Sequence, residues 1–182
     1  MKNLKNFISI SYTFLKFSII KFFHWNSFKF NFVERFSPDT CINIWRGASF
    51  LIGKRVRAHT GSKFSVVTNG ELIIGNNASF SYGCMVMCRK KIVIGEGVEL
   101  GPNVLIYDHD HDFRVVGGIK AKKYKCGSVE IGNNVWIGAN TVILRNTKIG
   151  ENCIIGAGSV IKGEYLPNSV VVQKRETSLI KF

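Results

Sequence analysis

Apolar residues recur at every sixth position through three segments of the chain, and seven of these twelve residues are followed at once by glycine. One apolar side chain per six residues is typical of a short flat strand that ends in a tight corner, where glycine lets the backbone turn without a Cβ clash. The twelve positions are Ile74, Phe80, Val86, Ile94, Leu100, Ile106, Ile131, Ile137, Ile143, Ile149, Ile155 and Ile161.

Three six-residue steps make one triangular coil. Such coils stack about 4.8 Å apart through hydrogen bonds between strands, so the inward residues form one continuous apolar column. An amphipathic helix would need apolar residues spaced three and four apart, and the strands of a β-sandwich would alternate with period two. The pattern therefore predicts a mainly β protein built as a parallel β-helix.

The first 33 residues differ in kind, because they contain five lysines, no acidic residue and an apolar series at helical spacing. We expect residues 1–38 to be a basic amphipathic segment that precedes a β-helix domain at 39–182. Lys16 and Lys21 interrupt the apolar series, so the run of about 18 apolar residues that a membrane-spanning helix needs is missing. The small-x-small pattern of signal-peptide cleavage is missing too.

Two interpretations of residues 1–33 remain open. The helix could lie on the anionic inner face of the cell membrane, giving a cytoplasmic protein with peripheral membrane association. Alternatively, it could pack on the end of the β-helix as a cap. Interleaved lysine and phenylalanine favour the membrane slightly.

The six-residue pattern breaks once, between Ile106 and Ile131, where residues 107–130 are polar and out of phase. This segment predicts a long loop extruded from the coil, and long loops on rigid scaffolds often carry function. It holds two of the four histidines, His109 and His111, and three aspartates. These residues could supply a general base with a carboxylate partner. A zinc or manganese site is the less favoured alternative, and we predict no metal.

The sequence VEIGNNVWIGANTVILRNTKIGENCIIGAGSVIKGEYLPNSVVV, which begins at Val129, resembles the hexapeptide-repeat acyltransferases. That family has a left-handed parallel β-helix fold and includes galactoside and maltose acetyltransferases and enzymes that acetylate capsule and lipopolysaccharide. The resemblance covers roughly residues 42–172. It implies a left-handed coil, a homotrimer with active sites between neighbouring subunits, and acetyl-CoA as the acyl donor.

The same resemblance places the catalytic histidine at His111, shortly after the segment PNVLIY, with His109 as the weaker candidate. An imidazole with a pKa near 6.5 can take the proton of an attacking hydroxyl group at neutral pH. We expect Asp108 to be the carboxylate that fixes its tautomer. Related sugar O-acetyltransferases shape the acceptor site with a large side chain where this chain has Trp136, although packing against a neighbouring subunit is nearly as good an interpretation.

Coenzyme A needs a groove of exposed backbone followed by cations for its phosphates. The resemblance puts Lys162 near the phosphates, and Lys174 and Arg175 are candidate substitutes for a basic residue that many relatives carry at the end of the domain. The small residues expected to line the groove are Gly138, Ala139, Gly156, Ala157 and Gly158.

The net charge of +13 on 182 residues changes this interpretation little. The lysines are dispersed and no base-stacking module is present, so nucleic acid is not favoured, whereas an anionic cofactor, glycan or lipid surface explains the charge. Five cysteines without a CxxC pair fit a reducing compartment, with Cys84 and Cys153 as small core residues.

These observations together predict an acetyl-CoA-dependent O-acetyltransferase that acts on a sugar hydroxyl of a surface polysaccharide or its lipid-linked precursor. An N-acetyltransferase acting on a nucleotide-linked amino sugar is the nearest alternative. A non-catalytic trimeric scaffold is a third, but a scaffold has no use for a 24-residue excursion rich in histidine and aspartate.

Overall fold

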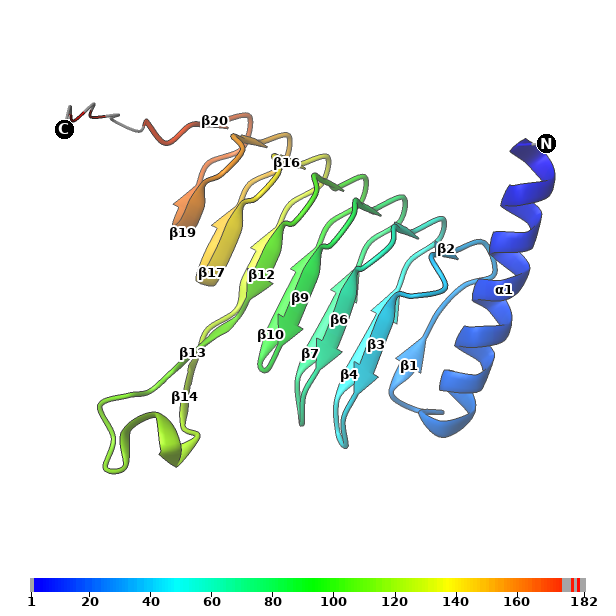
Figure 1. The fold of residues 1–182 in the computed structure, drawn as a ribbon, viewed down its shortest axis with the longest axis horizontal. Helices are drawn as coiled ribbons and strands as arrows, with labels where there is room; N and C mark the ends of the chain where they lie inside the picture. Colours follow the sequence, from blue (N-terminus) through cyan, green and yellow to red (C-terminus); the bar gives the residue numbers. More distant parts are fainter. Residues whose placement is uncertain (1, 175–177, 179, 181–182) are drawn as a thin grey trace.

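The computed structural model describes residues 2–174, 178 and 180, with side chains from residue 6 onward. The chain forms a parallel β-helix with one helix at its N-terminal end and one arm that projects from the coils (Figure 1). This confirms the fold class predicted from the sequence.

Each coil has three sides, which we call faces 1, 2 and 3, and the chain passes through them in the order 3, 2, 1. All strand pairs within the faces are parallel. Face 1 contains β1 (Phe28–Lys29), β4 (Ser49–Ile52), β7 (Glu71–Ile74), β10 (Lys91–Ile94), β15 (Val129–Ile131) and the second parts of β17 (Val142–Ile149) and β19 (Val160–Tyr165). Face 2 contains β3 (Cys41–Ile44), β6 (Lys63–Val66), β9 (Met85–Cys88), β12 (Leu105–Tyr107) and the first parts of β17 and β19. Face 3 contains β2 (Arg35–Phe36), β5 (Arg57–Ala58), β8 (Ser79–Phe80), β11 (Glu99–Leu100), β16 (Trp136–Ile137), β18 (Ile154–Ile155) and β20 (Val170–Val171).

The core is the apolar column that the six-residue pattern predicts. All twelve apolar residues of the six-residue pattern are at most 3% exposed. Phenylalanines continue the column toward the N-terminus, where the ring of Phe64 meets Phe36 in a tilted contact at 5.6 Å and Phe80 in an edge-on contact at 4.9 Å between centroids. The parallel sheets begin at Phe28, ahead of the domain boundary predicted at residue 38.

The glycines that follow the inward residues serve the contact between coils rather than the turn itself. Gly75 has no positive φ, and a Cβ on it would lie 2.6 Å from the carbonyl carbon of Gly95 on the next coil. The left-handed residue of that corner is Asn77, with a φ of 59°. Asparagine tolerates this conformation better than most residues.

Helix α1 (Lys2–Phe23) closes the N-terminal end of the column, as the cap interpretation expects. Phe17 is fully buried edge-on against Phe28 and Phe36, at centroid distances of 5.3 and 4.9 Å. Lys16 and Lys21 donate hydrogen bonds from Nζ to backbone carbonyls of the first coil. Among the residues that the structure describes, no helix is both long enough and apolar enough to cross a membrane.

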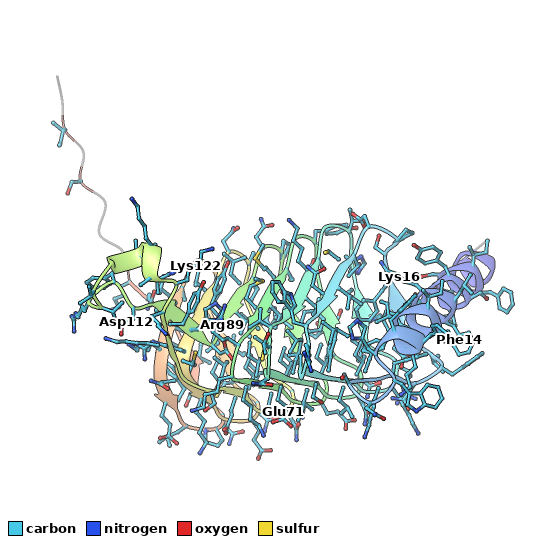
Figure 2. The ribbon with its side chains drawn as sticks, turned by 90° about the horizontal axis from the view of Figure 1, so that it is seen from below. Phe14, Lys16, Glu71, Arg89, Asp112 and Lys122 are labelled. Atoms are coloured by element: carbon cyan, nitrogen blue, oxygen red, sulfur yellow. The ribbon has the colours of Figure 1, made fainter. Side chains whose placement is uncertain are left out.

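The predicted extruded loop leaves the coil between β12 and β15, at the corner between faces 2 and 1. We call residues 108–128 the arm. Its base is a two-stranded antiparallel ribbon of β13 (His109–His111) and β14 (Tyr124–Cys126), and its tip contains a short 3-10 helix, Gly118–Ala121. The arm and α1 lie at opposite ends of the molecule (Figure 2).

Candidate active site

Asp108 anchors the arm to the β-helix. Its carboxylate is fully buried and accepts hydrogen bonds from the backbone N–H groups of Arg89, Lys90 and Lys91 at 2.6–2.9 Å. Burial alone would raise the pKa of Asp108, but the hydrogen bonds from His109 and from these amides outweigh it, so the pKa lies below its usual value. The carboxylate therefore stays ionised and ties the arm to a turn of the preceding coil.

The histidine that Asp108 contacts is His109. The two side chains meet through Nδ1 and Oδ1 at 2.9 Å, and only 15% of the His109 side chain is exposed. The sequence analysis expects this carboxylate to orient His111 instead. The difference follows from strand geometry: Ile106 and Asp108 are alternate inward residues, so Asp108 points into the coil, and of the two histidines it contacts only His109.

His111 is exposed on β13, and its ring lies 4.7 Å from that of Tyr124 on β14. The flanking aspartates are engaged elsewhere. Asp110 accepts a hydrogen bond from Nε of Arg145 at 2.6 Å, and Asp112 pairs with Lys125 at 3.3 Å. His111 thus stands on a stiffened ribbon with its imidazole accessible from outside.

Arg89 and Tyr124, which no sequence motif marks, complete the base of the arm. The guanidinium of Arg89 lies 3.7 Å over the ring of Tyr124, and its buried Nε has no hydrogen-bond partner among the described residues. Arg89 lies where the arm meets the β-helix, and Asp112 lies farther out (Figure 2). No local pattern could have found this pair, because Arg89 comes from a coil and Tyr124 from the arm, and they meet only when the arm folds back.

Trp136 lies on face 3, with 54% of its surface exposed, in register with Glu99 and Ile154 on the neighbouring coils. The arm leaves from the opposite corner of the coil (Figure 1). Within one chain the structure therefore does not bring Trp136 to either histidine of the arm.

The predicted cofactor residues form two groups. The corners after β16 and β18 lie on consecutive coils, and a Cβ on Gly138 would come within 2.5 Å of the Ala157 nitrogen. Lys162 is exposed on β19, beyond face 2, and is not part of this edge. Lys174 is exposed after β20, and Arg175 lies outside the described residues. The small residues Gly138, Ala139, Gly156, Ala157 and Gly158 lie at this edge, and their part in cofactor binding stays a prediction.

Within the described part of the chain, histidine, cysteine, aspartate and glutamate form no group of three or more that could hold a metal ion. The cysteines are free thiols, and Cys84 and Cys153 are buried. Burial raises the pKa of Cys84 to about 11, so this thiol is protonated at neutral pH.

Comparison with known proteins agrees with this architecture. Residues 128–163 match the family described as "Bacterial transferase hexapeptide (six repeats)". The chain is 34% identical over 110 residues to the candidate acetyltransferase YJL218W of Saccharomyces cerevisiae, which covers 60% of this chain and 55% of YJL218W. It is 24% identical over 131 residues to WbbJ of Escherichia coli, a candidate lipopolysaccharide biosynthesis O-acetyl transferase, covering 68% of this chain and 67% of WbbJ.

The chain thus spans about half the length of YJL218W, at 55%. Among solved structures it resembles AntD, an N-acyltransferase from Bacillus cereus whose crystal structure contains dTDP and 3-hydroxybutyryl-CoA. The TM-score is 0.69 at 20% identity, covering 88% of this chain and 87% of AntD. At this identity the likeness establishes a shared fold.

Proposed function

We propose that this chain, which is similar to the hexapeptide-repeat acyltransferases, is an acetyl-CoA-dependent O-acetyltransferase acting on a sugar hydroxyl. The acceptor we propose is a surface polysaccharide or its lipid-linked precursor, an assignment that the similarity to WbbJ supports. The observation that carries the proposal is the arm. It presents an accessible imidazole on a ribbon that Asp108 and Arg145 hold against the coils.

We assign the general base to His111. As the acceptor oxygen bonds to the acetyl carbonyl carbon, its proton passes to an unprotonated nitrogen of His111. The C–S bond then breaks, and the proton goes to the departing thiolate, which leaves as the free thiol of coenzyme A. These two proton transfers require an imidazole that can contact both the acceptor and acetyl-CoA, and an exposed imidazole can do so.

His109 is better suited to holding the arm than to catalysis. Its Nδ1 is engaged by Asp108, and its ring is covered by Tyr107 and Tyr124 in edge-on contacts at 6.4 and 5.5 Å. An imidazole fixed by a buried carboxylate is also the arrangement of a hydrolase triad, so the two histidines must be separated by experiment.

Asparagine at position 109 separates the two roles, because its Nδ2 can still donate to Asp108 while it removes the imidazole. We expect His109→Asn to retain most activity and His111→Ala to lose at least about a hundredfold in kcat. The measurement is acetyl transfer under saturating substrates, with thermal stability as the check on folding. An inactive His109→Asn alongside an active His111→Ala would reassign the base to His109.

Trp136 and the arm can meet only if a second copy of the chain supplies one of them. We therefore propose a homotrimer in which the arm of one subunit lies against face 3 of its neighbour, with Trp136 positioning the acceptor. An exposed indole suits such a contact because it combines a large apolar surface with an N–H donor. The oligomeric state by light scattering tests this arrangement.

The edge that contains Ala139 and Ala157 fits the pantetheine arm of acetyl-CoA, because its small side chains leave room for a close approach to the backbone. Lys162 stands apart from this edge, so we propose it, with Lys174, as a contact for the distal phosphates rather than for the arm. No contact with nucleic acid follows from this arrangement.

We propose that the outer side of α1 rests on an anionic membrane while its inner side caps the β-helix. Lys16 and Lys21 serve the cap, so apolar burial carries this contact. The exposed large apolar side chains of α1 include Phe7, Ile8, Leu15, Ile19 and Phe22. The full chain should sediment with vesicles that contain anionic lipid, and Phe22→Ser with Ile19→Ser should release it without lowering its thermal stability.

The reaction itself is tested with labelled acetyl-CoA and a panel of glycans, nucleotide sugars and amino sugars, followed by mass spectrometry. Transfer to a hydroxyl supports the proposal. Transfer confined to amines would establish an N-acetyltransferase instead. If no acceptor class is acetylated, the non-catalytic scaffold is the remaining alternative.

A further inference from the structure

A cleft lies between α1 and the N-terminal strands of face 3, far from the arm of the same chain. It consists of a hollow of about 640 Å³ and an adjoining hollow of about 430 Å³. Both are lined by Asn6, Arg35 and Arg57. Arg55 borders the smaller hollow, and His59 and Tyr82 border the larger one.

The centre of the cleft carries a pair of like charges. Arg35 and Arg57 are partners in the parallel pairing of β2 with β5, so the two cations project side by side from strands about 4.8 Å apart. Like charges in this position are destabilising. No residue that lines either hollow is acidic, and among the described residues no ion pair includes either arginine. Arg35 donates a hydrogen bond from Nη1 to Oδ1 of Asn6 at 2.8 Å, but no carboxylate in the lining offsets the charge of the two guanidinium groups.

Arg55 brings a third cation to the cleft at a conformational cost. It adopts a left-handed φ of 57°, where the equivalent corner positions on the following coils are asparagine or glycine, such as Asn77 and Gly97. The left-handed region costs an ordinary residue roughly 1–2 kcal/mol. Nε of Arg55 donates to Oδ1 of Asn77 at 2.7 Å, which leaves the end of the guanidinium beside the smaller hollow.

The far end of the larger hollow has a different character. The rings of His59 and Tyr82 lie 4.9 Å apart, and Tyr82 is largely exposed. The hydroxyls of Ser37 and Thr60 lie 3.1 Å apart beside them. An aromatic face next to hydroxyl groups suits a sugar ring, which offers both apolar C–H groups and hydroxyls.

We propose that this cleft binds the phosphate groups of the acceptor, so that the acetylated sugar is phosphate-linked or diphosphate-linked. The planar guanidinium groups of Arg35 and Arg57 match phosphate oxygens in pairs, and Arg55 adds charge at the same end. The sugar then lies toward Tyr82. The acetylation step rests on the proposed function, whereas anion binding in the cleft does not.

The cleft is tested with inorganic pyrophosphate, titrated calorimetrically into the full-length protein. Arg57→Gln is the informative variant because the Arg57 side chain makes no hydrogen bond or ion pair with any other described residue, and it should weaken binding at least about tenfold. Lys63→Gln is the matched control, since it removes one exposed charge from face 2, and it should bind as the wild type does. Absence of pyrophosphate binding, or equal weakening in both variants, would overturn the proposal.

Two further ligands identify the source of the phosphate. Uridine diphosphate binding more tightly than pyrophosphate indicates a nucleotide-linked sugar, and a polyprenyl diphosphate in nanodiscs binding more tightly indicates a lipid-linked one. If pyrophosphate binding depends on Arg57 but no acceptor is acetylated, the proposed anion site is supported and the proposed transferase activity is refuted. Acetyl transfer with an unchanged KM in Arg57→Gln keeps the transferase and refutes the acceptor site.

Discussion

Replacing Asp108 with asparagine tests whether one buried carboxylate holds the arm. Oδ2 accepts the backbone N–H groups of Lys90 and Lys91, while Oδ1 accepts from His109 and Arg89. An asparagine offers one oxygen and one NH2 group in the same space. In either orientation the NH2 faces donors, so about two buried N–H groups lose their acceptor.

The size of the effect follows from these contacts. An unsatisfied buried donor costs about 1–3 kcal/mol, so we expect Asp108→Asn to lower the free energy of unfolding by about 2–5 kcal/mol. For a domain of this size that corresponds to a drop of roughly 5–20 °C in Tm. Asp110→Asn is the matched control, because its ion pair with Arg145 is partly exposed and worth less than about 1 kcal/mol.

Differential scanning fluorimetry gives the Tm at a fixed scan rate, and hydrogen exchange reports the amides of Lys90 and Lys91 separately. Because the pKa of Asp108 is lower in the folded protein than in the unfolded chain, its stabilisation is fully present above the unfolded pKa near 4. It is lost as the pH falls through the folded value. The gap in Tm between wild type and variant should therefore be constant from pH 5 to 8 and close below about pH 4. A variant within 1 °C of the wild type, with both amides still protected, would show that this carboxylate is not the anchor.

Phe17→Ala should lower the free energy of unfolding by about 3–5 kcal/mol in chemical denaturation, because α1 loses its buried contact with the first coil; an unchanged midpoint would mean that α1 is not a stabilising cap. Ala157→Phe should raise the KM for acetyl-CoA while sparing the Tm, and an unchanged KM would move the cofactor off this edge. At acceptor concentrations far below KM, where Arg57→Gln alone is slow, an equal mixture of His111→Ala and Arg57→Gln subunits should reach about a quarter of wild-type activity, since one site in four then combines an intact cleft with an intact arm. Activity no higher than the mean of the two separate variants, after verified subunit exchange, would place both residues in the same chain's site.

The sequence by itself determined the β-helix, because one inward residue per six is a local requirement of every strand and corner. It also determined that the chain leaves the coil after Ile106, since the six-residue pattern stops there. It could leave only alternatives for residues 1–33. The tertiary structure shows that α1 caps the first coil, because Phe17 lies against Phe28 and Phe36. These contacts depend on how the first coil closes.

Contacts between coils were decided by the tertiary structure alone. Cys41 pairs with Lys63 whereas Val142 pairs with Val160, so the coils differ in length and a fixed period does not give the register. The sequence predicts Asp108 as a partner for His111. Strand alternation instead points its side chain inward, where it contacts His109. Arg35 and Arg57 look like dispersed charges in the sequence. They become a pair only because the chain closes one full turn between them, which places the two side chains on adjacent strands of one face.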